Sequence, residues 1–527
     1  MAELGQSAVA PGVAGDPEHP ETALFLAKRS LFLSKNELGV HEGLCEARIP
    51  CLCLPPGLTA AHLLGKNLAK RHRPTRASCA QMINKATSRL TTIPYYNILW
   101  AAIDGNELII DYATETSKTK LQRTRLSFSL DTVPPAQSQS FIEELLQHAY
   151  GQAERQRRAK VLVNPHAGPG NAIQLWENDV RPIFEAARMT LDVTTTTRGG
   201  EGTDICEALD ISAYDVVVVC SGDGLAHEVF NGFGKRADAR RALEKIAVAH
   251  IPCGSGNAMS CNLNGSHHPG PSALAVVKGV RTSMDLMSVT QGSQRILSFL
   301  SQSVGIIAEA DLATEGMRWL GAARFDVGVI QRIFSKKVYP CDIAVKVEIE
   351  DKLGVKAHYR RIRREQQEAP KKEEPDDGDG LPPLRFGTVN DNLPEDWQVA
   401  SHDKLGNFYC GNMAWMAPSA NFFNAAMMND GLMDVVTNDG DIPIFKYAAL
   451  MMSVESNKFF DNELVSYRKV SAYRFSPRDQ HDGYISIDGE RIPFGTFQVE
   501  IHPGLGTVIS KRGHYEANGP PGWKKSY

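Results

Sequence analysis

The sequence predicts three regions: a β-rich N-terminal region, a doubly wound α/β domain and an antiparallel β-sandwich. The α/β domain is predicted by three apolar runs, each ending in a glycine-containing turn before a segment with helical spacing. The sandwich is predicted by short alternating segments that dominate after Asp285. We expect the boundaries at 1–22 (disordered), 23–150 (β-rich), 155–285 (α/β), 286–512 (sandwich) and 513–527 (tail).

Composition limits the class of protein. The chain has 527 residues and a net charge of −4, so we expect two or three domains and no nucleic acid partner. Its ten cysteines form no zinc-type pairs, which is typical of reduced thiols. Neither a spanning apolar run nor a signal-peptide pattern is present. We therefore expect a cytoplasmic protein, soluble or peripheral on intracellular or plasma membranes.

The N-terminal region has strand patterns on both sides of a turn. Ile93–Ala102 and Leu108–Tyr112 flank the hairpin dipeptide Asp104-Gly105, and Ser140–Leu146 has the spacing of an amphipathic helix. Strands closed by one helix resemble a pleckstrin-homology domain. Three cysteines upstream are candidates for S-acylation, with ordinary thiols as the simpler interpretation: Cys45, Cys51 and Cys53.

The turn Ser221-Gly222-Asp223-Gly224 follows the apolar run Val216–Cys220 and opens a helical segment. The carboxyl end of a buried parallel strand and the beginning of the next helix face one crevice, where ligands bind. The glycines allow a close backbone approach, and Asp223 presents one carboxylate there. A helix-capping aspartate in an ordinary turn is the alternative interpretation.

Two further turns repeat this arrangement. Val161–Val163 ends at Asn164–Asn171, which is not a Walker A loop because no Gly-Lys-Ser/Thr follows. Ile246–Pro252 ends at Cys253–Asn257, where Gly-Ser-Gly offers N–H groups suited to phosphate oxygens. We interpret two histidines in these segments, His227 and His250, as packing residues.

The C-terminal half alternates strands with one helical passage, Ile306–Phe334. A charged, breaker-rich segment at 361–380 indicates a disordered insert, which we extend to 361–402. The expected strands lie at 343–350, 406–417, 484–492 and 496–501.

Taken together, these segments resemble the sphingosine (long-chain base) kinases of the diacylglycerol-kinase catalytic superfamily. The resemblance covers residues 160–510 and depends on the family's segments in the family's order: Asn164-Pro165 with its loop, SGDGLAHEVFNG (221–232), GSGNA (254–258), the passage 308–328 and IDGE (487–490). It implies an α/β catalytic domain that binds nucleotide and a β-sandwich domain that binds lipid. It also implies transfer of the ATP γ-phosphoryl group to the primary hydroxyl of a sphingoid base, with Mg²⁺.

The resemblance assigns roles by position. Asp223 would accept the proton of the lipid hydroxyl, and Asp311 would pair with the substrate's ammonium. The substrate-binding residues would be Ser221, Gly222, Asp223, Gly224, Ser301 and Asp311. The ATP-binding residues would be Asn164, Pro165, His166, Thr196, Thr197, Arg198, Gly199, Gly200, Glu228, Gly254, Ser255, Gly256, Arg318, Arg324, Asp488, Gly489 and Glu490. No metal ligand is assigned, since Mg²⁺ would be held mainly through ATP.

The chain departs from the family pattern in the first two nucleotide segments. His166 and Pro169 stand where the family usually carries Arg or Lys, which weakens the expected phosphate contact. The match at Thr196–Gly200 is open to a shift of one residue, and a β-prone strand end would explain Thr194–Thr197 equally well.

Three alternatives remain open. A ceramide or diacylglycerol kinase is disfavoured by Asp311, because neither lipid offers an amine. A non-catalytic scaffold is disfavoured by the intact Asp223 and Gly254–Gly256 segments, and an NAD kinase-like enzyme by Ser221. The expected partner is a membrane-resident sphingoid base met by peripheral membrane association. The preferred base, the target membrane, regulation, the role of residues 1–150 and homodimer formation stay open.

Overall fold

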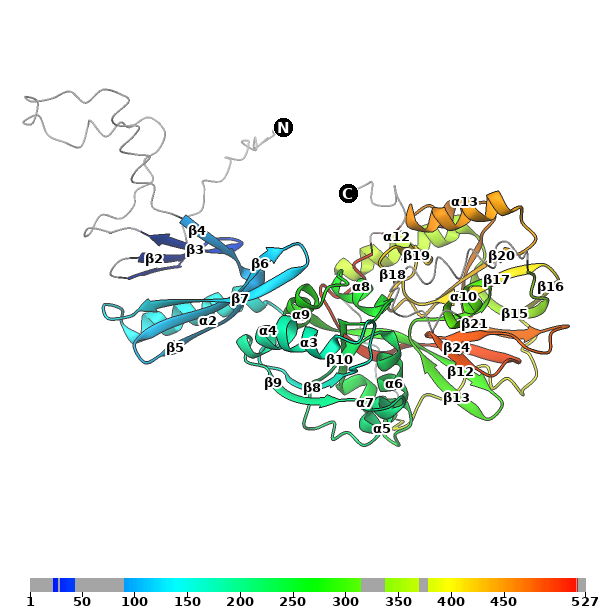
Figure 1. Ribbon diagram of the computed structural model, residues 1–527, viewed down its shortest axis with the longest axis horizontal. Coiled ribbons are helices and arrows are strands. Elements are labelled where there is room, and N and C mark those ends of the chain that lie inside the picture. Colours follow the sequence, from blue (N-terminus) through cyan, green and yellow to red (C-terminus); the bar gives the residue numbers. More distant parts are fainter. Residues whose placement is uncertain are drawn as a thin grey trace, which may run out of the picture. The chain divides into compact units, whose positions relative to one another are not determined.

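The computed structural model describes residues 22–26, 29–42, 90–313, 337–368, 378–517 and 519 of the chain (Figure 1). The chain divides into two compact units. Unit 1 consists of residues 1–112 and 124–151, and unit 2 of residues 113–123 and 152–527. The expected disorder at 1–22, almost all of the expected tail and the three candidate acylation cysteines lie outside the described residues.

Unit 1 is rich in β-structure, as predicted. A four-stranded antiparallel sheet has the order β1-β2-β3-β4, and a second sheet has the order β5-β6-β7. The strands are β1 (Thr22–Phe25), β2 (Arg29–Leu33), β3 (Glu37–Glu42), β4 (Leu90–Pro94), β5 (Ile98–Asp104), β6 (Glu107–Ser117) and β7 (Lys120–Ser129). The single strand expected at 93–102 is interrupted by the 3₁₀ turn η2 (Tyr95–Asn97).

The helix that follows, α2 (Pro135–Tyr150), begins five residues before the predicted start because Pro135 supplies a favourable first helical position. Its buried face includes Phe141, Leu145 and Leu146, at helical spacing. The resemblance of this region to a pleckstrin-homology domain stays a prediction.

The first part of unit 2 is the predicted α/β arrangement. Parallel strands lie in the order β11-β10-β8-β9, and each is followed by a helix (Figure 1). Every residue of β10 is buried, as expected for a parallel strand covered on both faces. The elements are β8 (Arg158–Val163), α3 (Ala172–Leu175), the π-helical turn η3 (Trp176–Val180), α4 (Arg181–Ala186), β9 (Thr190–Thr195), α5 (Glu201–Glu207), β10 (Val216–Ser221), α6 (Asp223–Gly234), α7 (Ala239–Lys245), β11 (Ala247–Pro252), α8 (Ala258–Asn264) and α9 (Pro269–Lys278).

The second part of unit 2 is mainly antiparallel. Strands β12, β14, β15, β17, β20, β21, β22 and β24 contribute to one hydrophobic core, in which Phe408 and Tyr473 are buried. The elements are β12 (Val280–Gln291), β13 (Gln294–Ser298), β14 (Ser301–Gly305), α10 (Ile306–Ala313), β15 (Cys341–Ile349), α12 (Lys352–Glu368), β16 (Gln398–His402), β17 (Leu405–Gly411), β18 (Trp415–Ala417), β19 (Ala420–Asn421), β20 (Met433–Asp439), α13 (Ile444–Glu455), η5 (Phe459–Asp461), β21 (Ser466–Pro477), β22 (Ile485–Ile487), β23 (Glu490–Ile492) and β24 (Phe497–Ser510). The four predicted strand segments are therefore present, and the finer description as a sandwich stays a prediction.

One strand joins the two parts of unit 2. β24 pairs in parallel with β11 through Val508 and Val248, and it pairs antiparallel with β12 and β21. The boundary expected at 285/286 falls inside β12. The α/β part and the antiparallel part therefore share a continuous sheet, which fixes the loops of one against the hairpins of the other.

The predicted disordered insert at 361–402 is wrong at both of its ends. Residues 361–368 are the last turns of α12, and β16 covers 398–402. Val355, Tyr359 and Ile362 recur at helical spacing and pack on the core, while the charged residues between them face outward. Only Ile362 of this face falls within 361–368, so the mean polarity of the predicted insert does not indicate a helix there. Residues 369–377 lie outside the described residues.

In the described part of the chain, no helix is long and apolar enough to cross a membrane.

Candidate functional site

The site lies where β8, β10 and β11 end. Hydrogen bonds from Asn164 N to Cys220 O (3.1 Å) and from Cys253 N to Ser221 O (2.9 Å) hold the loops that follow these strands side by side. The segments 164–171, 221–224 and 253–257, separate in the sequence, therefore meet at one edge of the sheet. This is the juxtaposition that the three turns predicted.

Two of these loops touch backbone to backbone. A Cβ atom on Gly254 would lie 2.4 Å from the Cα atom of Gly222 and 2.8 Å from its nitrogen. Real Cβ atoms do not approach backbone so closely, so position 254 accepts only glycine unless a loop moves. Asn257 closes the same loop by accepting from Gly254 N (2.8 Å) and donating to Gly254 O (2.7 Å).

The carboxylate of Asp223 is fixed by the beginning of α8. Its Oδ2 accepts from Ala258 N and its Oδ1 from Met259 N, each at 2.9 Å. Both N–H groups lack a partner within the helix, and the helix dipole favours a negative charge there. Asp223 is only half-buried, so its remaining lone pairs are accessible to a hydroxyl donor. The carboxylate is thus held in one orientation before any ligand binds.

Glu228 has a corresponding role at α5. Its Oε1 accepts from Gly200 N (3.0 Å) and its Oε2 from Gly202 N (2.8 Å). Glu201 accepts from the backbone and hydroxyl of Thr197, and Arg198 pairs with Asp204. Glu228 therefore holds the loop 196–200 next to α6, the helix that Asp223 begins.

The hairpin between β22 and β23 reaches the same place from the antiparallel part. A Cβ atom on Gly224 would lie 2.9 Å from Oε1 of Glu490, so this carboxylate lies against the Ser221–Gly224 turn. Asp488 and Gly489 form the turn itself, with φ angles of +53° and +87°. The structure therefore brings the predicted IDGE segment to the predicted SGDG segment.

Asp488 differs from Glu490 because its carboxylate is buried and occupied. It is 2% exposed and accepts from the hydroxyl of Ser298 (2.6 Å) and from the backbone N–H groups of Phe299, Leu300 and Ser301 (2.9–3.1 Å). Its Oδ2 also lies 2.8 Å from Nδ1 of His227. Protein donors thus take up the oxygens that we expected to face the nucleotide.

His227 joins the two parts of unit 2. It lies on α6, one turn after Asp223, and reaches Asp488 of the hairpin. Burial disfavours the charged imidazole, but Asp488, Glu490 and Glu228 outweigh this, and the pKa of His227 is raised. Our interpretation of His227 as a simple packing residue missed this ion pair. His250 is buried as predicted, and burial lowers its pKa.

The structure describes some of the remaining predicted site residues in full, some in part and some not at all. Ser301 opens β14; its carbonyl oxygen accepts from Asp488 N (2.8 Å), and its own N–H donates to the carboxylate of Asp488 (2.9 Å). Asp311 lies in α10, which directly follows β14, but its side chain is outside the description. Arg318 and Arg324 lie outside the described residues. Sequence reasoning missed two asparagines, Asn257 and Asn231. The side-chain amide of Asn231 donates to Leu297 O and accepts from Leu297 N. An asparagine next to a glycine loop was the available signal for Asn257.

A metal ion has no ready-made cage in the part of the chain that the structure describes, where no three His, Cys, Asp or Glu side chains form a suitable group. Asp223 and Glu490 are the two carboxylates that the loops bring to the Gly224 turn. Two carboxylates in addition to ligand phosphates suit Mg²⁺, which usually keeps few protein ligands.

Comparison with known proteins agrees with this geometry. The model of the diacylglycerol kinase catalytic domain matches residues 158–289, and a domain of unknown function matches residues 57–151. Sphingoid long chain base kinase 4 of Schizosaccharomyces pombe is 34% identical, over 79% of this chain and 88% of the relative. Sphingoid long chain base kinase 5 of Saccharomyces cerevisiae is 31% identical over 74% of this chain, and the match spans 65% of that relative.

Human sphingosine kinase 1 is more distant, at 27% identity over 71% of this chain and 95% of the relative. The match to the Schizosaccharomyces pombe relative covers most of both chains. The chain therefore belongs to the family of the sphingoid long chain base kinases.

Proposed function

We propose that the protein is an ATP-dependent lipid kinase that transfers the γ-phosphoryl group to the primary hydroxyl of a sphingoid long-chain base. The observation that carries this proposal is the carboxylate of Asp223, locked by Ala258 N and Met259 N where three glycine-containing loops meet. Phosphoryl transfer requires in-line positioning and charge neutralisation more than covalent help. A fixed, partly exposed carboxylate beside loops that suit phosphates supplies the positioning.

Each loop has a part in the proposed reaction. The segments 164–166, 196–200 and 254–256 bind ATP, and Glu228 keeps the second of them in place through Gly200 and Gly202. Asp223 accepts the hydrogen bond of the attacking hydroxyl and takes its proton as the new P–O bond forms. The bond to the leaving ADP oxygen breaks in the same transfer.

A bound Mg²⁺ ion would neutralise phosphate charge. Asp223 and Glu490 are the residues that would hold it, together with the ATP phosphates, while Asp488 acts through His227 and the turn at Ser298–Ser301. Asp488 therefore supports the site as a positioning residue instead of contacting ATP. Arg318 and Arg324 stay proposed phosphate contacts on the strength of the family resemblance.

The substrate class depends on Asp311. A carboxylate near the substrate head can pair with the ammonium group of a sphingoid base, which ceramide and diacylglycerol lack. Ser301 lies in the strand that leads into the helix of Asp311, and this adjacency supports a role for both residues in binding the lipid head group. Such a substrate resides in bilayers, so the protein meets it by peripheral membrane association.

The test is transfer of labelled γ-phosphate from ATP with Mg²⁺ to sphingosine, ceramide and diacylglycerol in parallel micelles. We expect labelled sphingosine phosphate alone, and a rate lower by about 10²–10⁴-fold for Asp223→Asn. Asp210→Asn, a change at an exposed aspartate of the same unit, serves as the matched control. Labelling of a neutral lipid would overturn the role of Asp311, and the absence of any labelled lipid would overturn the kinase proposal.

A further inference from the structure

Helix α13 carries an exposed apolar face. Phe445 is 89% exposed and Met452 is 71% exposed, although both are large hydrophobic residues. Seven residues separate them, which is about two turns, so both lie on one side of the helix. Ala448 and Ala449 lie between them on the same side and are also exposed. These four residues define the α13 face.

The opposite side of α13 is built into unit 2. Tyr447, Leu450 and Val454 are buried, and Tyr447 shares a small core with Ile306 and Tyr339. The helix is therefore anchored, and its outer face stays uncovered by any residue that the structure describes. Figure 1 shows α13 on the outer side of the antiparallel part.

The position of α13 relates it to the lipid side of the site. Ile306 begins α10, the helix that contains Asp311, and Tyr339 lies just beyond the residues 314–336 that the structure leaves undescribed. Ile306 and Tyr339 thus both pack on the inner side of α13. A lipid that reaches Asp311 from a bilayer would enter close to this helix.

Charges of both signs border the α13 face, since the exposed Asp441 lies just before the helix and pairs with Lys404. Lys446 follows Phe445, and Lys458 lies just after the helix; neither makes an ion pair with a described residue. Glu455 is the acidic residue of the helix and lies at its last position. An exposed apolar stripe bordered by charged residues is the pattern of helices that lie in a membrane interface.

We infer that the α13 face inserts into the interface of a lipid bilayer and holds the protein at the membrane from which it takes its lipid. A second copy of the chain fits the face less well. Twelve residues span about 18 Å, so a stripe about 10 Å wide covers about 200 Å², against about 800 Å² per partner in a stable dimer. The inference depends on the proposed function for its purpose, but its test does not require catalysis.

The experiment is flotation of the full-length protein with mixed phosphatidylcholine–phosphatidylserine vesicles, without ATP or substrate. We expect Phe445→Glu combined with Met452→Glu to weaken vesicle binding by about tenfold or more, since two apolar side chains lose their place in the bilayer. Val399→Glu is the matched control, because Val399 is 62% exposed on β16, away from α13. The control should bind as the wild type does.

Three outcomes would overturn the inference: equal binding by the α13 variant, no binding by the wild type, or equal losses in the α13 variant and the control. Thermal unfolding of each variant shows whether the fold is retained. Sedimentation of the same proteins tests whether a second copy of the chain or another protein covers the α13 face instead. A dimer or protein complex that is lost only in the α13 variant would also overturn the inference. Vesicle binding without lipid phosphorylation would instead retain the α13 face and reject the proposed kinase.

Discussion

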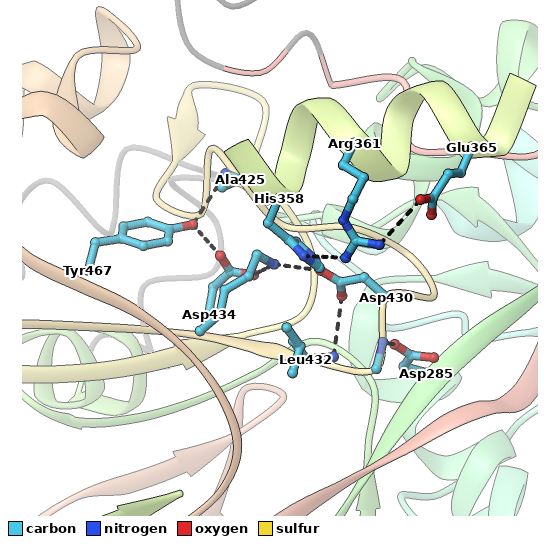
Figure 2. A network of polar contacts seen from close by, with 11 residues as sticks. Asp285, His358, Arg361, Glu365, Ala425, Asp430, Leu432, Asp434 and Tyr467 are labelled. Carbon is cyan, nitrogen blue, oxygen red and sulfur yellow. Dashed lines mark hydrogen bonds and ion pairs between the residues drawn. The ribbon is translucent and has the colours of Figure 1, made fainter. Parts of the chain in front are cut away.

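Two groups of carboxylates in unit 2 are stabilised in opposite ways. Asp223 and Glu228 are half-buried, and each accepts two backbone N–H groups at the beginning of a helix. Asp430 and Asp434 are fully buried and share the ammonium group of Lys469, at 2.8 and 2.9 Å (Figure 2). The first group leaves its oxygens partly open to ligands, whereas the second leaves none.

The buried group extends beyond its central ion pairs. His358 of α12 lies 2.8 Å from Asp430, and the hydroxyl of Tyr467 donates to Asp434 at 2.6 Å (Figure 2). Burial raises the pKa of Asp434, whereas Lys469 and His358 overcome burial and lower the pKa of Asp430. Backbone N–H donors thus orient carboxylates that stay accessible to a ligand. The buried charge network instead holds α12, β20 and β21 together.

The largest expected effect comes from the scaffold group. Lys469→Met leaves two buried carboxylates without their cation, so we expect the free energy of unfolding to fall by about 3–5 kcal/mol. Urea unfolding measures this change. Adding Asp430→Asn and Asp434→Asn to Lys469→Met removes the uncompensated charges and should restore part of the loss. A loss below about 1 kcal/mol for the single variant would show that the network stabilises little.

An intermediate effect is expected at the loops of the site. Gly254→Ala places a Cβ atom 2.4 Å from the Cα atom of Gly222, so a loop must move and shift the Asp223 turn. We expect a loss of about 1–3 kcal/mol in the free energy of unfolding and a lipid phosphorylation rate lower by about 10²-fold. Gly495→Ala, which meets only a side-chain nitrogen at 3.8 Å, is the control. Equal rates for both variants would contradict the close loop contact.

The smallest expected effect concerns the ion pair between His227 and Asp488. This pair links the α/β part of unit 2 to its antiparallel part. The pKa of His227 is raised above 6.5, so the charged imidazole binds its proton more tightly in the folded protein than in the unfolded chain. Its contribution to stability is present in full below pH 6.5 and is lost as pH rises through the folded pKa. His227→Asn should remove this part of the pH dependence.

Unfolding of wild type and His227→Asn at a series of pH values measures the difference, and NMR titration of labelled histidine gives the pKa directly. A His227 pKa at or below 6.5 would contradict the ion pair, as would identical pH profiles for the two proteins.

The same contrast explains what the sequence could predict. The Asp223 site depends on short segments in which strand, turn and helix follow each other directly, so Ser221–Gly224 and Gly254–Gly256 were recognisable before the structure. The buried network combines His358, Lys469 and the neighbouring pair Asp430 and Asp434 from three separate parts of the chain, and no local pattern marks them as partners. His227 was missed for the same reason, because its partner Asp488 lies 261 residues away.

Element boundaries show a further physical limit. Mean polarity predicted disorder over residues that form the end of α12, because Ile362 is the one apolar residue among the charged and polar residues of 361–368. The α13 face is the opposite case, since Phe445 and Met452 are apolar and yet exposed, which only the structure shows. Pattern alone indicates that a helix has an apolar side, not what covers that side.

The shared strand β24 has a consequence for how this protein is made. Val508 completes the parallel sheet beside Val248, and residues 498–510 pair with β12 along nearly its whole length. During synthesis the strands β8, β10 and β11 leave the ribosome long before their neighbour β24 does, so an edge of the sheet stays open until late in translation. Folding of unit 2 should therefore be slow and dependent on chaperones, and a stop codon before residue 497 should yield aggregated protein instead of an active fragment.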